Sequence, residues 1–193
     1  GSEEAVSFLQ SEILAQELKG VHFIDLNIDE ISYKQPTQIA AMEWLVTLYQ
    51  ETASTPPSID SSSIDIIKAG LSKYNGILGR PLINSAALER VETLDLVQEY
   101  NAQVVVTAAG REGMPSNAVE RVQNAMIMIE EARKRNIGLS DLFVDLLVFP
   151  ISVDSAFGTD YLNAVADLRQ EFGQEIHIIG GLSNVSFGLP KRK

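Results

Sequence analysis

The chain alternates between amphipathic helical patterns and short apolar strand patterns, and this alternation constrains the fold more than any other feature. Helices are predicted over residues 3–18, 36–48, 64–73, 86–100, 115–135 and 159–172. Strands are predicted over residues 21–28, 56–60, 82–84, 104–107, 142–147 and 176–179. Strands that alternate with helices pair in parallel through right-handed crossovers, which makes this an α/β chain. An open doubly wound sheet and a TIM-type (β/α)8 barrel both satisfy the pattern.

The chain has 193 residues, and no linker or low-complexity segment divides it, so we expect one domain over residues 1–193. A (β/α)8 barrel usually takes about 250 residues. This chain opens on a helix pattern and stops just after a strand pattern. As a barrel it is therefore expected to lack the first strand and the last βα portion.

Composition excludes several classes of function. The net charge of −11 argues against general nucleic-acid binding, because neutralising phosphates requires clustered Lys and Arg. The one tight basic cluster, residues 191–193, is expected to be a solvated terminus. No apolar run approaches the roughly 18 residues of a membrane helix, so no membrane segment is expected. The chain has no cysteine, which excludes thiol chemistry and fits a cytoplasmic location.

Metal and hydrolase sites are not predicted either. His22 and His177 are the only histidines, and both lie in strand patterns, where packing is favoured over catalysis. No group of His, Asp or Glu residues has the spacing of metal ligands. Ser61, Ser183 and Ser186 have no evident histidine partner, which disfavours a serine hydrolase triad.

Polar side chains recur where the strand patterns end. These residues are Asp60, Asn84, Asp145 and, just past the last strand, Asn184. Period-two alternation also places Asp25 and Asn27 on one face of their strand. In a parallel barrel the carboxyl ends of the strands converge on one mouth. Carboxylates that accept and carboxamides that donate and accept suit a flat heterocycle with an amino group, a ring N–H and a carbonyl.

Structural explanations compete with this interpretation at each position. Asp60 precedes three serines, so it could serve only to cap the following helix. For Asp25 and Asn27, a hydrogen bond within the chain explains the residue as well as a ligand contact does.

Seven segments in order carry a family resemblance: FIDLN at 23–27, AMEWLV at 41–46, IDS at 59–61, LINS at 82–85, REGMP at 111–115, VDLLVFP at 144–150 and LSNVS at 182–186. This set resembles the pterin-binding methyltransferase family. That family includes the methyltetrahydrofolate:corrinoid/iron–sulfur protein methyltransferases and the folate domain of cobalamin-dependent methionine synthase. The resemblance covers nearly the whole chain.

The resemblance implies a TIM barrel whose strand ends hold a pterin. By matching motif, Asp60, Asn84 and Asp145 would bind the pterin ring, and Asn184 would bind near N5 as the catalytic residue. The implied reaction moves a methyl group between N5 of methyltetrahydrofolate and the cobalt of a corrinoid (cobalamin) carried by a partner protein. The family also suggests a homodimer, although nothing in this chain defines an interface.

Two alternatives stay open. Dihydropteroate synthases share the barrel and the pterin pocket, but they typically read Ser-Arg-Lys-Ser-Phe where this chain has Ser-Asn-Val-Ser-Phe at 183–187. Val185 thus replaces a lysine that contacts the pterin in that family. The other alternative is a module that binds a pterin or a corrinoid protein without turnover, which the expected absence of both barrel ends motivates.

Overall fold

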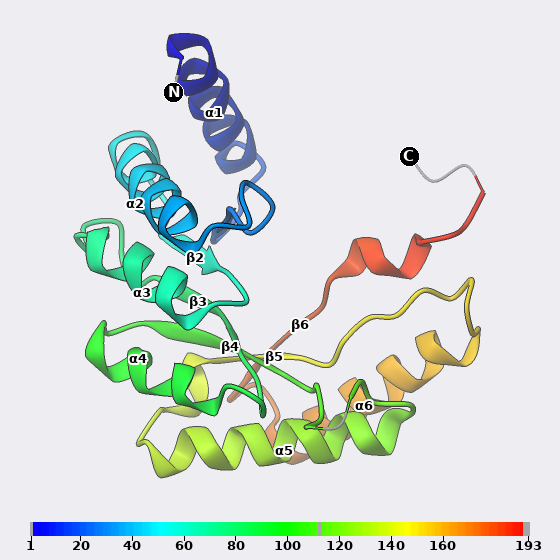
Figure 1. Cartoon of the computed structure of the whole chain (residues 1–193). Helices are drawn as coiled ribbons and strands as arrows, with labels where there is room; N and C mark the ends of the chain where they lie inside the picture. Colours follow the sequence, from blue (N-terminus) through cyan, green and yellow to red (C-terminus); the bar gives the residue numbers. More distant parts are fainter. Residues whose placement is uncertain (1, 112, 191–193) are drawn as a thin grey trace. The chain divides into compact units, whose positions relative to one another are not determined.

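The computed structural model describes residues 2–111 and 113–190 (Figure 1). Glu112 and the basic cluster at 191–193 lie outside the described residues. The chain divides into two compact units, one made of residues 1–85 and 96–103 and the other of residues 86–95 and 104–193. The single domain over residues 1–193 stays a prediction.

The first unit is built on three strands and three long helices. Their bounds are α1 Glu3–Glu17, β1 Ile24–Asn27, α2 Gln35–Thr52, β2 Pro57–Asp60, α3 Ile64–Lys73 and β3 Leu82–Ala86. β1 pairs with β2 and β2 with β3, both in parallel. Parallel neighbours in chain order, each joined by a helix, are the repeating unit of a (β/α) barrel.

Helix α3 packs closely against strand β2. Gly70 of α3 faces the sheet, and a Cβ added there would lie 2.9 Å from Cγ2 of Ile59 and 3.0 Å from Cγ of Met42. Ile59 and Met42 are both fully buried. Only a residue without a side chain allows this approach without displacing Ile59 or Met42.

The second unit repeats the same architecture. Its bounds are β4 Gln103–Thr107, α5 Ala118–Lys134, β5 Leu142–Asp145, α6 Ala156–Phe172 and β6 His177–Ile179, with the 3-10 helices η2 Leu139–Asp141 and η3 Leu182–Ser186. β4 pairs with β5 and β5 with β6, again in parallel. The α/β class and the parallel pairing expected from the sequence are therefore confirmed.

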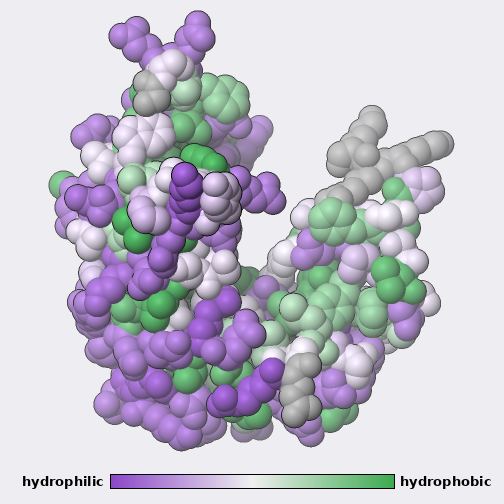
Figure 2. All heavy atoms as spheres, in the orientation of Figure 1, coloured by the Kyte–Doolittle hydropathy of each residue, from purple (hydrophilic) through white to green (hydrophobic). Residues whose placement is uncertain are grey.

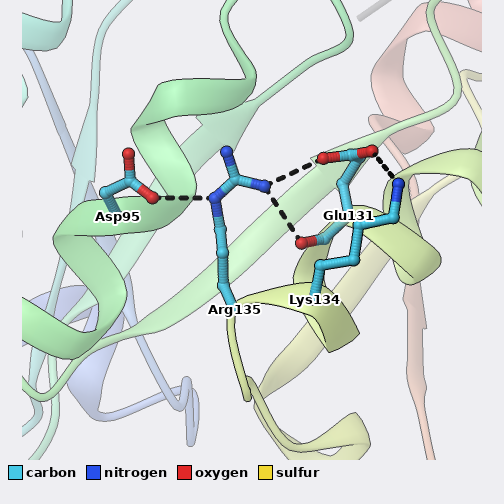
Figure 3. A network of polar contacts seen from close by, with 4 residues as sticks. All are labelled: Asp95, Glu131, Lys134 and Arg135. Atoms are coloured by element: carbon cyan, nitrogen blue, oxygen red, sulfur yellow. Dashed lines mark hydrogen bonds and ion pairs between the residues drawn. The ribbon is translucent and has the colours of Figure 1, made fainter.

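Ion pairs tie the end of α5 to the residue that begins α4 (Asp95–Glu99) (Figure 3). Arg135 Nε donates to Asp95 Oδ1 at 2.7 Å, and its Nη1 donates to Glu131 Oε2 at 2.9 Å. Lys134 Nζ donates to the other oxygen of Glu131 at 2.7 Å. The hydrogen bond to Asp95 raises the pKa of Arg135, and the one from Lys134 lowers the pKa of Glu131.

The predicted helix over residues 86–100 is wrong in extent. Ala86 ends β3, a 3-10 helix η1 covers Val91–Leu94, and α4 has only five residues. Ala86, Ala87 and Leu88 are all buried in succession, whereas a surface helix buries every third or fourth residue. Other boundaries shift by a few residues: β1 begins at Ile24 rather than 21, and α5 begins at Ala118 rather than 115.

The surface is mixed. Hydrophilic residues cover much of the face seen in Figure 2, interrupted by smaller hydrophobic groups. Among the described residues, none of the helices has both the length and the apolar character that crossing a bilayer requires.

Candidate functional site

A row of polar side chains crosses the carboxyl ends of the three strands in the first unit. The strand register places Asn27 of β1 beside Asp60 of β2, and Asp60 beside Asn84 of β3. Asn27 Nδ2 donates to Asp60 Oδ2 at 2.9 Å. Side chains at equivalent register positions of parallel neighbours point to the same face of a sheet. The structure therefore brings together three of the residues that the sequence singled out.

Asp25 joins this row from one step down the same strand. β1 alternates buried Ile24 and Leu26 with exposed Asp25 and Asn27, as the period-two pattern predicts. Asn84 Nδ2 donates to Asp25 Oδ1 at 3.4 Å, at the long end of hydrogen-bonding distances. Asp25 and Asn27 thus both make hydrogen bonds within the chain, which is the structural role that the sequence left open for them.

Asp29 fastens the loop after β1 to the loop after β2, a role that the sequence analysis missed. Its Oδ1 accepts from Ser61 Oγ at 2.6 Å, and its Oδ2 accepts from the backbone and hydroxyl of Ser62, both at 3.0 Å. The backbone N–H of Asp29 in turn donates to Asn27 Oδ1 at 2.9 Å. A side-chain oxygen that accepts the backbone N–H two residues further on defines an Asx turn. Asn27, two residues before Asp29, was therefore the sequence signal for this turn.

The capping explanation for Asp60 is wrong. The N-cap of α3 is Ser63, three residues after Asp60, and it makes no side-chain capping bond. Ser61 Oγ instead accepts the backbone N–H of Ser63 at 3.1 Å. Asp60 is therefore a strand-end carboxylate with the Asn27 amide against it. A hollow of about 550 Å³ is lined by residues 27–31, of which Asn27 belongs to this row.

Asp145 occupies the corresponding place in the second unit. It ends β5, in register with Thr107 of β4 and Ile179 of β6. Its Oδ1 accepts the backbone N–H of Leu147 at 2.9 Å. Burial raises the pKa of the Asp145 carboxyl, and the hydrogen bond from Leu147 opposes that shift. Thr107, which the sequence analysis did not single out, has a buried Oγ1 without a hydrogen-bond partner among the described residues.

Asn184 lies in the turn of η3 that follows β6. Its backbone N–H donates to Gly181 O at 2.9 Å, and its side chain packs on Gly181, where an added Cβ would lie 2.9 Å from Nδ2. The loop after β5 holds this turn in place. Ile151 N–H donates to Val185 O at 3.2 Å, and the hydroxyl of Ser152 donates to Phe187 O at 2.5 Å.

Tyr161 of α6 supports the strand end that leads to this turn. Its hydroxyl donates to Ile179 O at 3.1 Å. A Cβ added on Gly180 would lie 2.6 Å from the oxygen of this Tyr161 hydroxyl. Burial raises the pKa of Tyr161, and the charge of Asp145 adds to the shift, so this hydroxyl stays protonated at neutral pH. A side chain at position 180 would therefore crowd Tyr161.

The histidines and any metal site fall outside this picture. His22 precedes β1 and is exposed, so its predicted place inside a strand is wrong, while His177 stacks on Phe143 with ring centroids 4.4 Å apart. Within residues 2–111 and 113–190, no group of three or more His, Cys, Asp or Glu residues could hold a metal ion. The strand ends present carboxylates and carboxamides, which interact by hydrogen bonding.

Comparison with known proteins adds three findings. Residues 5–192 match the family described as pterin binding enzyme. The chain is 29% identical to the methylcorrinoid:tetrahydrofolate methyltransferase of Eubacterium limosum, across 99% of this chain and 70% of that protein. It is 27% identical to the methionine synthase of Mycobacterium leprae, across 88% of this chain but only 15% of that protein.

Solved structures share the fold. The dihydropteroate synthase of Xanthomonas albilineans in complex with 7,8-dihydropteroate superposes with a TM-score of 0.62 at 19% identity, across 95% of this chain and 66% of that one. The synthase of Stenotrophomonas maltophilia gives a TM-score of 0.62 at 15% identity, across 92% of this chain and 67% of that one. This chain thus spans about two thirds of the length of these synthases.

Proposed function

The chain belongs to the pterin binding enzyme family, and on that premise we propose that it transfers a methyl group between N5 of methyltetrahydrofolate and the cobalt of a corrinoid. The corrinoid would be carried by a partner protein. The observation that carries this proposal is the likeness, along nearly the whole chain, to a protein named for transfer between a methylcorrinoid and tetrahydrofolate. Its expected setting is one-carbon metabolism in the cytoplasm.

The polar row of the first unit is proposed to bind the pterin ring. Asp60 accepts from the amino group and ring N–H, and Asn84 matches a mixed edge of donor and acceptor atoms. A carboxylate has about four lone-pair sites, so Asp60 can accept from both the Asn27 amide and a pterin. Asn27 is then a residue that orients Asp60, and Asp25 does the same for Asn84.

For Asp145 and Asn184, in the second unit, the proposed roles rest on the family motif alone. Asp145 binds the ring, and Asn184 donates a hydrogen bond at N5. When methyltetrahydrofolate is the donor, the C–N5 bond breaks with its electron pair left on N5, and the reduced cobalt supplies the pair for the new bond to carbon. The Asn184 amide strengthens its hydrogen bond as charge develops on N5, which lowers the barrier. An amide cannot supply a proton, so the proton that N5 takes up comes from water.

The competing function is a dihydropteroate synthase, because solved structures of that enzyme share this fold. Val185 speaks against it, because an aliphatic side chain stands where that family's motif has lysine. Proteins bind phosphate groups with Arg, Lys or a nest of backbone N–H groups. The carboxylates and amides of these strand ends are poorly suited to the pyrophosphate of a synthase substrate.

One pair of assays separates the candidates. The chain is mixed with methyltetrahydrofolate and cob(I)alamin, and formation of methylcobalamin is followed by its absorbance; the reverse reaction is followed in the same way. In parallel, the chain is given a dihydropterin pyrophosphate and p-aminobenzoate. Methyl transfer supports the proposal, and dihydropteroate formation replaces it with a synthase. Saturable folate binding without transfer, also with a corrinoid protein present, would leave a non-catalytic module.

A further inference from the structure

Arg121 is a buried cation placed where a helix does not favour one. It lies in the first turn of α5 (Ala118–Lys134), and its side chain is 0% exposed. A helix N-terminus carries partial positive charge, so a cation there is disfavoured. Burying a charge costs further free energy unless hydrogen bonds compensate it. This arginine therefore needs a compensating role in the folded structure.

The guanidinium of Arg121 contacts the turn that follows β5. Nε donates to Leu146 O at 3.1 Å, and Nη2 lies 3.5 Å from Leu147 O. The guanidinium carbon sits 4.7 Å from the centre of the Phe149 ring, within the range of a cation–π contact. The remaining nitrogen, Nη1, is buried and has no partner among the described residues. Burial lowers the pKa of Arg121, and the charges of Asp160 and Glu120 oppose that shift.

The same turn holds Asp145. Leu147 has a φ of 64°, in the left-handed region that a branched residue rarely adopts. Its N–H donates to Asp145 Oδ1, while its carbonyl and that of Leu146 face Arg121. The turn is thus held from both sides, by a carboxylate on its amide and a guanidinium on its carbonyls. A shift of the turn moves the hydrogen bond that orients the Asp145 carboxylate.

We propose that Arg121 is a positioning residue for pterin binding, which fixes the 146–147 turn and thereby orients the Asp145 carboxylate toward the ring. This inference rests on the proposed function. The planar fork of arginine spans two carbonyls and stacks on Phe149 at the same time, which the point charge of lysine cannot do.

The test compares methyltetrahydrofolate affinity by calorimetry in wild type, Arg121→Lys and Arg121→Gln. We expect Arg121→Lys to weaken binding about tenfold, or about 1.4 kcal/mol, and Arg121→Gln to weaken it more. The lysine variant keeps the charge, so it yields a result even if the glutamine variant fails to fold. Met128→Ala is the matched control, because Met128 is fully buried on the same helix. It should lower the melting temperature and leave the affinity unchanged.

A double-mutant cycle provides the readout that a general loss of packing would not give. In an Asp145→Asn background, Arg121→Lys should cause little further loss of affinity, because its effect passes through the Asp145 carboxylate. Full additivity of the two losses would overturn the positioning role. So would wild-type affinity in Arg121→Lys. If wild type itself binds no pterin, the proposed function fails, and this inference fails with it.

Discussion

Asn27→Asp is the sharpest test of the polar row, because it changes one amide nitrogen to an oxygen. In the structure Asn27 Nδ2 lies 2.9 Å from Asp60 Oδ2. The variant replaces that hydrogen bond with two carboxylate oxygens in contact. It keeps the acceptor oxygen that takes the Asp29 N–H, so the turn after β1 should survive.

The magnitude follows from this distance. Two unit charges 2.9 Å apart repel by about 1.4 kcal/mol even in bulk water. Loss of the existing hydrogen bond adds about 1 kcal/mol. The pair escapes the repulsion by turning Asp60 away or by protonating one carboxyl, and both remove the ionised acceptor that a pterin needs. Returning Asp60 to its ionised, correctly oriented state for pterin binding should cost about 2 kcal/mol, so the Kd for methyltetrahydrofolate should rise about thirtyfold at pH 7.

The assay is calorimetric titration with methyltetrahydrofolate, together with urea unfolding across a pH series. Like charge raises the pKa of one carboxyl in the variant. The stability deficit relative to wild type should thus be greatest at high pH and shrink as the pH falls through the raised pKa. Asn75→Asp is the control, since it adds the same charge in the same unit and keeps the oxygen that accepts the Ile77 N–H. Wild-type affinity in Asn27→Asp would refute the reasoning.

Three further predictions concern the second unit. Asn184→Ala should reduce methyl transfer more than pterin binding, because its hydrogen bond strengthens as N5 gains charge; equal losses in single-turnover rates and titrations would contradict this. Asp145→Asn should weaken pterin binding yet raise stability at pH 7 in urea unfolding. The reason is that burial raises the pKa of Asp145, so its charged form destabilises the fold above that pKa and protonation relieves the cost as the pH falls. Gly180→Ala should destabilise by about 1–3 kcal/mol, since its Cβ would lie 2.6 Å from the Tyr161 hydroxyl. Tyr161→Phe in the same chain should recover part of that loss, and no recovery would mean that the crowding lies elsewhere.

Local patterns in the chain predicted much of the fold. The helix over residues 64–73 and the strand end at Asp60 agree with the structure. The alternation that puts Asp25 and Asn27 on one exposed face of β1 agrees as well. These features depend on periodicity and on turn residues, which act over a few neighbouring positions. They can therefore be inferred from the sequence alone.

The remaining features depend on contacts between distant segments. The helix predicted from residue 86 fails because Ala86, Ala87 and Leu88 are buried in succession, a fact about packing that no local period records. The pairing of Asn27 with Asp60 requires the register of two strands 33 residues apart. Arg121 reads as an ordinary charged residue of a helix, and its burial against the carbonyls of residues 146 and 147 emerges only when α5 packs beside β5. Residue type fixes which hydrogen bonds a side chain can make, and the long-range packing selects which of them form.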